Sequence, residues 1–152
     1  MVKQLSERGV KVFLFGHGRN EKNVLYSWQK KYDNVFAMPP ETYLPQELIL
    51  MAHLDVMVSM DSANMHMASM VATPVVSVWG ATHPYAGFMG WKQSEDNAVQ
   101  LPLECRPCSV FGEKPCRRNG KGEHYECVRG IAPEMIVEKV MKVLGENPIK
   151  QN

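Results

Sequence analysis

From residue 11 to residue 101, short apolar runs alternate with amphipathic segments, and this alternation constrains the fold more than any other feature. Gly, Pro or polar residues bound each apolar run, which is typical of buried strands. We expect strands at 11–15, 34–38, 55–60 and 75–79, a further candidate strand at 98–101, and helices at 21–31, 44–54 and 63–71. Strands joined through helices in this way form a parallel sheet with helices on both faces. The sequence therefore predicts a doubly wound α/β fold.

After Gly80 the alternation gives way to irregular sequence. Residues 81–91 and 105–127 are typical of loops, whereas the apolar residues between Pro133 and Leu144 have helical spacing. We therefore divide the chain into a core over residues 1–101, a cysteine-containing loop over residues 102–130 and a C-terminal helix over residues 131–146.

The composition is that of one ordinary globular domain. The 152 residues are 45% hydrophobic and 22% charged, and a chain of this length buries a sizeable core without disulfides. A net charge of +1 provides no basic field for phosphates, so nucleic acid is not an expected partner. No apolar stretch approaches the roughly 20 residues of a membrane helix, and the N-terminal residues lack the apolar core of a signal peptide. We therefore expect a cytoplasmic protein.

Polar residues gather where the third expected strand meets the third expected helix, at Asp61, Ser62, Ala63, Asn64 and His66. Ligands of open α/β sheets bind beyond the carboxyl ends of strands, where a helix N-terminus offers unpaired N–H groups and a positive dipole end. With Ser62 as the N-cap, His66 lies about one turn along the same helix face, so its imidazole can donate to an anion there. Asp61 can order the loop or accept hydrogen bonds from sugar hydroxyls. Ordinary helix capping is the alternative interpretation of Asp61 and Ser62.

The stretch from Val58 to Pro84 resembles the signature of glycosyltransferase family 9, the heptosyltransferases of lipopolysaccharide core assembly. The family pattern reads Asp-(Ser/Thr)-Gly-x-x-His, then a helix of small residues, a proline, a strand and Gly-x-Thr-x-Pro. Asp61–His66 and Gly80–Pro84 match the two halves at the right separation. The cysteine run and the segment Ile131–Glu134 also resemble members of the family.

The resemblance implies one half of a two-domain, GT-B-type glycosyltransferase with facing Rossmann-like halves. Residues 1–152 would form the C-terminal domain, which binds a nucleotide-sugar donor of the ADP-heptose type. The N-terminal half of such enzymes binds the acceptor and holds the catalytic base, and it has no counterpart in this chain. We therefore expect no catalytic residue here and no transferase turnover by the chain alone. The acceptor would be a glycolipid at the inner face of the cytoplasmic membrane.

The same resemblance assigns seven residues to donor binding: Asp61, Ser62, Ala63, Asn64, His66, Thr82 and Glu21. The first four match the loop that receives the diphosphate and sugar, His66 matches a histidine near the phosphates, and Glu21 resembles the acidic residue that reaches the ribose. Ala63 replaces the usual glycine, and its methyl group is unwelcome if that position needs a positive φ or close approach to phosphate. A helix N-terminus with Ser62 and His66 would stabilise the leaving diphosphate without a divalent metal. The sequence contains no Asp-x-Asp motif.

All four cysteines fall within 23 residues, at Cys105, Cys108, Cys116 and Cys127. The first pair has the Cys-x-x-Cys spacing of zinc ligands, but the second pair is more widely spaced than in a zinc ribbon. A structural zinc site, thiols that pack or oxidise, and disulfide pairs are three open interpretations. The basic residues among them would offset the charge of four thiolates, or contact an anionic acceptor or a membrane surface: Arg106, Lys114, Arg117, Arg118, Lys121 and Arg129.

Two further functions compete with donor binding. One is a different sugar-nucleotide enzyme on the same two-domain fold, such as an epimerase-like protein, in which the Gly-x-Thr-x-Pro match would be coincidental. The other is a non-catalytic, metal-stabilised interaction module, in which the cysteine loop would bind a partner and the sheet would only carry it.

Overall fold

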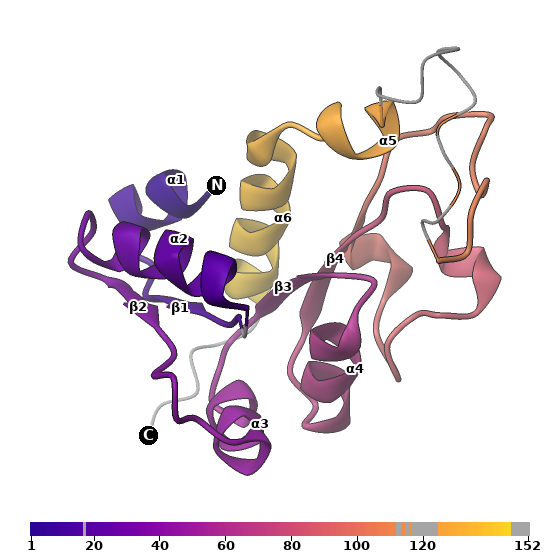
Figure 1. Ribbon diagram of the computed structural model, residues 1–152. Coiled ribbons are helices and arrows are strands. Elements are labelled where there is room, and N and C mark those ends of the chain that lie inside the picture. Colours follow the sequence, from indigo (N-terminus) through magenta and orange to yellow (C-terminus); the bar gives the residue numbers. More distant parts are fainter. Residues whose placement is uncertain (17, 112–113, 115, 117–124, 147–152) are drawn as a thin grey trace. The chain divides into compact units, whose positions relative to one another are not determined.

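The computed structural model describes residues 1–16, 18–111, 114, 116 and 125–146 of the chain. These residues form helices and parallel strands in two compact units, Met1–Glu47 and Leu48–Asn152 (Figure 1). The division falls within α3 (Leu44–Ala52). Each unit has the strand–helix alternation predicted from the sequence, which confirms the α/β, Rossmann-like class.

The first unit is built on two parallel strands. Its elements are α1 (Val2–Glu7), β1 (Val12–Leu14), α2 (Arg19–Gln29) and β2 (Val35–Ala37). Val12 pairs with Val35 and Leu14 with Ala37. Val2, Leu14 and Val35 form a small core with Val12, Leu25 and Tyr32 packed against it. Val12, Leu14 and Val35 of the two strands thus face this core, whereas Phe36 of β2 is exposed.

The second unit contains a three-stranded parallel sheet in the order β3-β4-β5. Its further elements are β3 (Met57–Met60), α4 (Ala63–Met70), β4 (Val75–Val78), the 3₁₀ turns η1 (Pro84–Ala86) and η2 (Glu95–Asn97), β5 (Ala98–Val99), α5 (Glu126–Arg129) and α6 (Pro133–Glu146). Met57 pairs with Val75, and Val78 pairs with Val99. The predicted strand 98–101 is therefore only two residues long.

The central strand β4 is covered on both faces. All four of its side chains are buried, because α4 packs against β3 and β4 while α6 packs against β4 and β5 (Figure 1). Trp79 follows β4 and is fully buried, and its indole Nε1 donates a hydrogen bond to Ser77 Oγ over 2.8 Å. This packing fixes the point at which β4 ends and its following loop begins.

One part of the cysteine-containing loop differs from the prediction. Residues 105–127 were expected to be irregular, but α5 forms at their end, where Tyr125 O accepts hydrogen bonds from the N–H groups of Val128 and Arg129 over 2.9 and 2.8 Å. Four helical residues are too few to produce a visible period in the sequence. Among the described residues, no helix is both long and apolar enough to span a bilayer.

Candidate functional site

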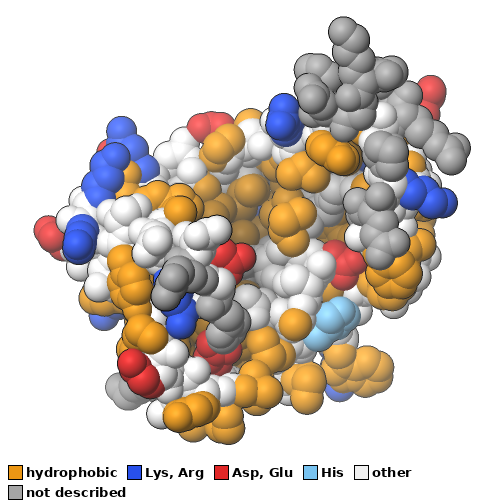
Figure 2. Space-filling model, viewed as in Figure 1, with side chains coloured by type: hydrophobic (Ala, Val, Ile, Leu, Met, Phe, Trp, Pro, Cys, Tyr) orange, Lys and Arg blue, Asp and Glu red, His pale blue; other side chains and the backbone are white. Residues whose placement is uncertain are grey.

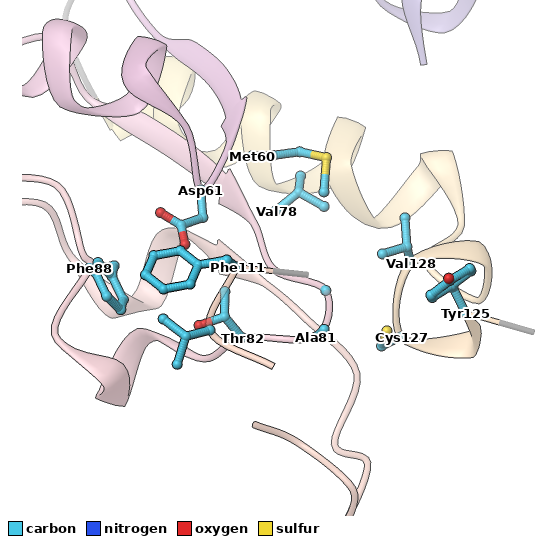
Figure 3. Close-up of a pocket in the computed structure, with 12 residues that line it drawn as sticks. Met60, Asp61, Val78, Ala81, Thr82, Phe88, Phe111, Tyr125, Cys127 and Val128 are labelled. Carbon is cyan, nitrogen blue, oxygen red and sulfur yellow. The ribbon is translucent and has the colours of Figure 1, made fainter. Parts of the chain in front are cut away.

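An open pocket of about 480 Å³ lies at the carboxyl ends of β3 and β4 (Figure 3). Its lining residues come from the ends of these strands, the loops that follow them and α5: Met60, Asp61, Val78, Gly80, Ala81, Thr82, Phe88, Val110, Phe111, Tyr125, Cys127 and Val128. The volume suits a small molecule. The location is the one where open α/β sheets bind ligands.

Close packing of α5 against the end of β4 closes one side of the pocket. A Cβ atom on Gly80 would lie 2.6 Å from Val128 Cγ2, so only glycine allows this approach. Figure 3 shows Tyr125, Cys127 and Val128 on one side of the pocket and Phe88, Phe111, Asp61 and Thr82 on the other. The pocket therefore depends on the docking of a distant segment onto the sheet.

Aromatic side chains form much of the wall. The rings of Phe88 and Phe111 meet edge to face with their centroids 6.4 Å apart. Phe111 is 78% exposed and Tyr85, on the neighbouring η1, is 81% exposed. Hydrophobic side chains are visible on this part of the second unit, on the right of Figure 2. Exposed apolar surface around a pocket is typical of a binding site rather than of a free surface.

Asp61 and Thr82 are the polar side chains of this wall. Burial raises the pKa of the Asp61 carboxyl above its ordinary value, and the nearby His66 partly opposes the rise. Thr82 is only 8% exposed, and its Oγ1 has no hydrogen-bond partner among the described residues. A buried hydroxyl normally has a partner. Thr82 is therefore a candidate hydrogen-bonding group for a bound ligand.

The start of α4 lies next to Asp61. Ser62 is the N-cap residue, as predicted, with extended backbone angles of φ −157° and ψ 171°. Its side chain makes no cap bond to α4 and instead lies with its Oγ 2.9 Å from Ser59 Oγ. The structure therefore does not support the alternative interpretation, in which the Ser62 side chain caps α4.

The remaining predicted residues of this loop lie on the first turns of α4. Ala63 is the first helical residue and is not among the residues with positive φ, so the methyl group causes no backbone strain there. Asn64 is half-buried, and His66 is exposed and does not line the pocket. His66 interacts electrostatically with Asp61, whose pKa it lowers.

Glu21 lies in the other unit. It is the third residue of α2, and its Oε2 accepts a hydrogen bond from the Gly18 N–H over 3.4 Å. This contact belongs to the cap of α2, in line with the local role of an acidic residue in a first turn. Its role at a ribose remains a prediction.

The cysteines do not form a ligand cluster in the described part of the chain. All four are free thiols; Cys105 and Cys108 are exposed, Cys116 is half-buried and Cys127 is buried. Burial raises the pKa of the Cys127 thiol, and Cys108, Cys116 and Cys105 add to the rise while Arg106 opposes it. Within the described residues, no three or more His, Cys, Asp or Glu side chains are arranged to hold a metal ion. The structural zinc site remains a prediction, which elemental analysis of the purified chain would test.

Arg106 was predicted to balance thiolate charge or to contact an anionic acceptor. Its electrostatic interaction with Cys127, Cys105 and Cys108 agrees with charge balance, whereas contact of its guanidinium with an acceptor stays a prediction. The group donates hydrogen bonds inward, to Gly80 O, Thr82 O, Leu101 O and Gln100 Oε1. Burial lowers the pKa of Arg106 from its ordinary value, and the negative charge of the Cys127, Cys105 and Cys108 thiolates opposes the change. Nothing in the sequence distinguishes Arg106 from the other basic residues of its loop. Arg117, Arg118 and Lys121 lie outside the described residues.

A second cavity, of about 510 Å³, shows that volume alone does not identify the site. Its lining includes Met70, Trp91 and Lys92, and it lies near Pro74, at the amino end of β4. The Gln93 side chain there is used structurally, since it accepts from Val75 N over 2.7 Å and donates to Thr73 O over 3.1 Å. The pocket after β3 and β4 has both the location and the unpartnered hydroxyl of a ligand site.

Comparison with known proteins connects the chain to heptosyltransferases. A family model described as glycosyltransferase family 9 (heptosyltransferase) matches residues 1–120. A lipooligosaccharide heptosyltransferase 2 of Campylobacter jejuni is 24% identical over 136 residues, which cover 87% of this chain and 40% of that protein. A lipopolysaccharide heptosyltransferase 2 of Salmonella typhimurium is 25% identical over 156 residues, covering 98% of this chain and 41% of that protein.

A solved structure is similar in fold. It is described as the structure of E. coli ADP-heptose lps heptosyltransferase II, with a TM-score of 0.67 and 22% sequence identity. The match covers 95% of this chain and 39% of that one. The chain therefore spans about two fifths of the length of the relatives it matches. With the family match over most of its length, the chain belongs to glycosyltransferase family 9.

Proposed function

We propose that this chain supplies the donor-binding part of a glycosyltransferase that moves a heptose or a similar sugar from a nucleoside diphosphate to the lipopolysaccharide core. The observation that carries the proposal is the pocket at the ends of β3 and β4, which both Asp61 and Thr82 line. These residues come from the two halves of the family signature. The names of the relatives, heptosyltransferases of lipopolysaccharide and lipooligosaccharide, support the same substrate class.

In this proposal the donor diphosphate lies at the start of α4. Ser62 makes no side-chain cap bond, so the first backbone N–H groups of the helix are suited to phosphate oxygens. His66, on the same helix, adds a hydrogen-bond donor or a positive charge near the anion. Both act on the charge that develops on the leaving nucleoside diphosphate, without a catalytic divalent metal.

The sugar lies in the pocket itself. The Asp61 carboxylate accepts hydrogen bonds from sugar hydroxyls, and Thr82 Oγ1 provides a hydroxyl that the described residues leave unpartnered. The Phe88 and Phe111 rings supply an apolar wall against the carbon-bound hydrogens of the sugar. The acceptor hydroxyl displaces the diphosphate at the anomeric carbon, through an oxocarbenium-like transition state.

The rest of the reaction requires groups beyond these. We assign the catalytic base and the glycolipid-binding surface to a second, N-terminal domain, and expect no turnover by residues 1–152 alone. The reaction would take place at the inner face of the cytoplasmic membrane, where a nucleotide-sugar and a glycolipid acceptor meet. Basic residues of the cysteine loop would assist peripheral association with that surface.

The epimerase-like alternative is less well supported. It requires the Gly-x-Thr-x-Pro match to be coincidental, yet Thr82 from that match lines the same pocket as Asp61. The metal-stabilised interaction module is also less well supported, because no cluster of side chains among the described residues is arranged to hold a metal ion.

Calorimetric titration of the purified chain with ADP, UDP, GDP and ADP-heptose tests the proposal. We expect ADP-heptose to bind, ADP to bind more weakly, and His66→Ala to weaken both. His53→Ala is the matched control, because His53 is exposed and its ring forms a local hydrogen bond with Ile49 O. Equal binding by the two variants would contradict a diphosphate site at α4. A folded chain that binds none of the four ligands would contradict donor binding.

A further inference from the structure

We propose that Arg106 is a positioning residue of the candidate site. Its guanidinium holds the Gly80–Thr82 wall of the pocket and thereby keeps the Thr82 hydroxyl in place for a bound sugar. The identity of the ligand rests on the proposed function, whereas the contacts of Arg106 do not depend on it.

The guanidinium joins two segments that each follow a strand. After β4, Nε donates to Gly80 O over 2.5 Å and Nη2 donates to Thr82 O over 2.9 Å. After β5, Nη1 donates to Leu101 O over 2.6 Å and Nη2 donates to Gln100 Oε1 over 3.0 Å. These bonds occupy four of the five N–H groups of a rigid, planar fork. Arg106 therefore fixes the loop after β4 relative to the loop after β5.

The residue between the two acceptors is also held from the same segment. Ala81 O accepts a hydrogen bond from the Cys108 N–H over 2.9 Å. Three consecutive carbonyl groups of the pocket wall, from Gly80 to Thr82, thus bond to residues 106–108. The backbone of Thr82 is fixed by these bonds, while its side chain has no partner among the described residues.

This division of contacts explains why an arginine is needed. A lysine would keep the positive charge, but its ammonium group is a single point on a flexible stem and does not reproduce a planar fork. Arg106→Lys would therefore release part of the Gly80–Thr82 wall while leaving the charge of the loop unchanged. The Thr82 hydroxyl would then lose the orientation that a ligand needs.

A double-mutant cycle separates positioning through Thr82 from a general structural effect. We measure ADP-heptose affinity by calorimetry for the wild type, Arg106→Lys, Thr82→Val and the double variant. We expect Arg106→Lys to weaken binding about tenfold and to add almost nothing in the Thr82→Val background, because coupled residues are not additive. Arg129→Lys is the matched control, since Arg129 is exposed on α5 and does not line the pocket. Additive effects of Arg106→Lys and Thr82→Val, or wild-type affinity in Arg106→Lys, would overturn the proposal.

A second variant tests the same contact if Arg106→Lys does not fold, and a measurement without ligand tests it if ADP-heptose does not bind. If Arg106→Lys does not fold, Gln100→Ala removes a single acceptor and is expected to weaken binding about twofold to threefold through the same coupling to Thr82; additivity with Thr82→Val would again overturn the proposal. If the wild type does not bind ADP-heptose, the proposed function fails. Amide hydrogen exchange then still tests whether Arg106 holds the Gly80–Thr82 wall in place. We expect the Cys108 N–H to exchange faster in Arg106→Lys, or in Gln100→Ala, than in Arg129→Lys. Equal exchange would overturn the positioning role.

Discussion

Two regions of the molecule build the candidate pocket in different ways. The strand-end region, residues 57–66 and 75–82, follows from regular elements, β3, α4 and β4, with buried side chains and local backbone bonds. The cysteine-loop region, residues 102–130, depends on contacts with distant residues, such as Arg106 with Thr82 and Val128 with Gly80. The sheet thus supplies the polar groups on a rigid frame, and a docked segment supplies an apolar wall.

The largest expected effect comes from the strand-end region. Trp79→Ala removes a fully buried indole and should lower the free energy of unfolding by about 3–5 kcal/mol. Trp91→Ala is the control, because Trp91 is 71% exposed and its loss should stay within about 0.5 kcal/mol. Urea unfolding followed by circular dichroism measures both. Similar losses in the two variants would contradict the view that the end of β4 anchors this unit.

A smaller effect is expected where the two regions meet. Gly80→Ala places a methyl group against Val128, which must move, so we expect a loss of about 1–3 kcal/mol from overpacking. Gly145→Ala has nothing within 4 Å of the new Cβ and lies in α6, where alanine stabilises by up to about 1 kcal/mol. Thermal unfolding compares the two. A neutral Gly80→Ala would show that α5 is not tightly docked on β4.

Asp61 should show that the polar wall serves function rather than stability. Burial raises the pKa of its carboxyl, so the folded chain holds that proton more tightly than the unfolded chain does. Stability from this group is therefore lost as the pH rises from about the ordinary value of 3.8 through the raised pKa. In denaturation at a series of pH values, the free energy of unfolding of Asp61→Asn should rise relative to that of the wild type as the pH increases across that window. The variant should also bind ADP-heptose less well. A relative gain that grows toward acid pH instead would have the wrong sign.

The smallest effect is expected at Ser62. Because its side chain makes no cap bond to α4, Ser62→Ala should change the free energy of unfolding by less than about 0.5 kcal/mol. A true N-cap serine would cost about 1 kcal/mol. Urea unfolding distinguishes the two values. A loss near the larger figure would mean that ordinary capping accounts for this residue.

The strand-end region was largely predictable because its signals are local. Short apolar runs predicted β3 and β4, and Thr73 and Pro74 indicated the end of α4. The pair Asp61 and Ser62 before the helix predicted Ser62 as the N-cap, which is correct. The direction of the Ser62 side chain was not predictable, because Ser59 competes with the helix for it. Propensity does not choose between two such partners.

The cysteine-loop region was less predictable because its contacts are long-range. Arg106 bonds to residues 24 and 26 positions away, and no periodicity reports such a pairing. The aromatic wall of Phe88 and Phe111 likewise joins two irregular segments. The cysteine spacing suggests a metal site. The contribution of this part of the loop to the pocket is instead the packing of Val128 on Gly80.

Methyl-detected NMR with ADP-heptose shows which of the two cavities of the second unit binds the donor, because both cavities are lined by methyl groups. We expect the methyl signals of Met60, Ala81, Thr82 and Val128 to shift on binding, while those of Met70 and Val143, at the second cavity, do not. Shifts confined to Met70 and Val143 would contradict a donor site at the carboxyl ends of β3 and β4.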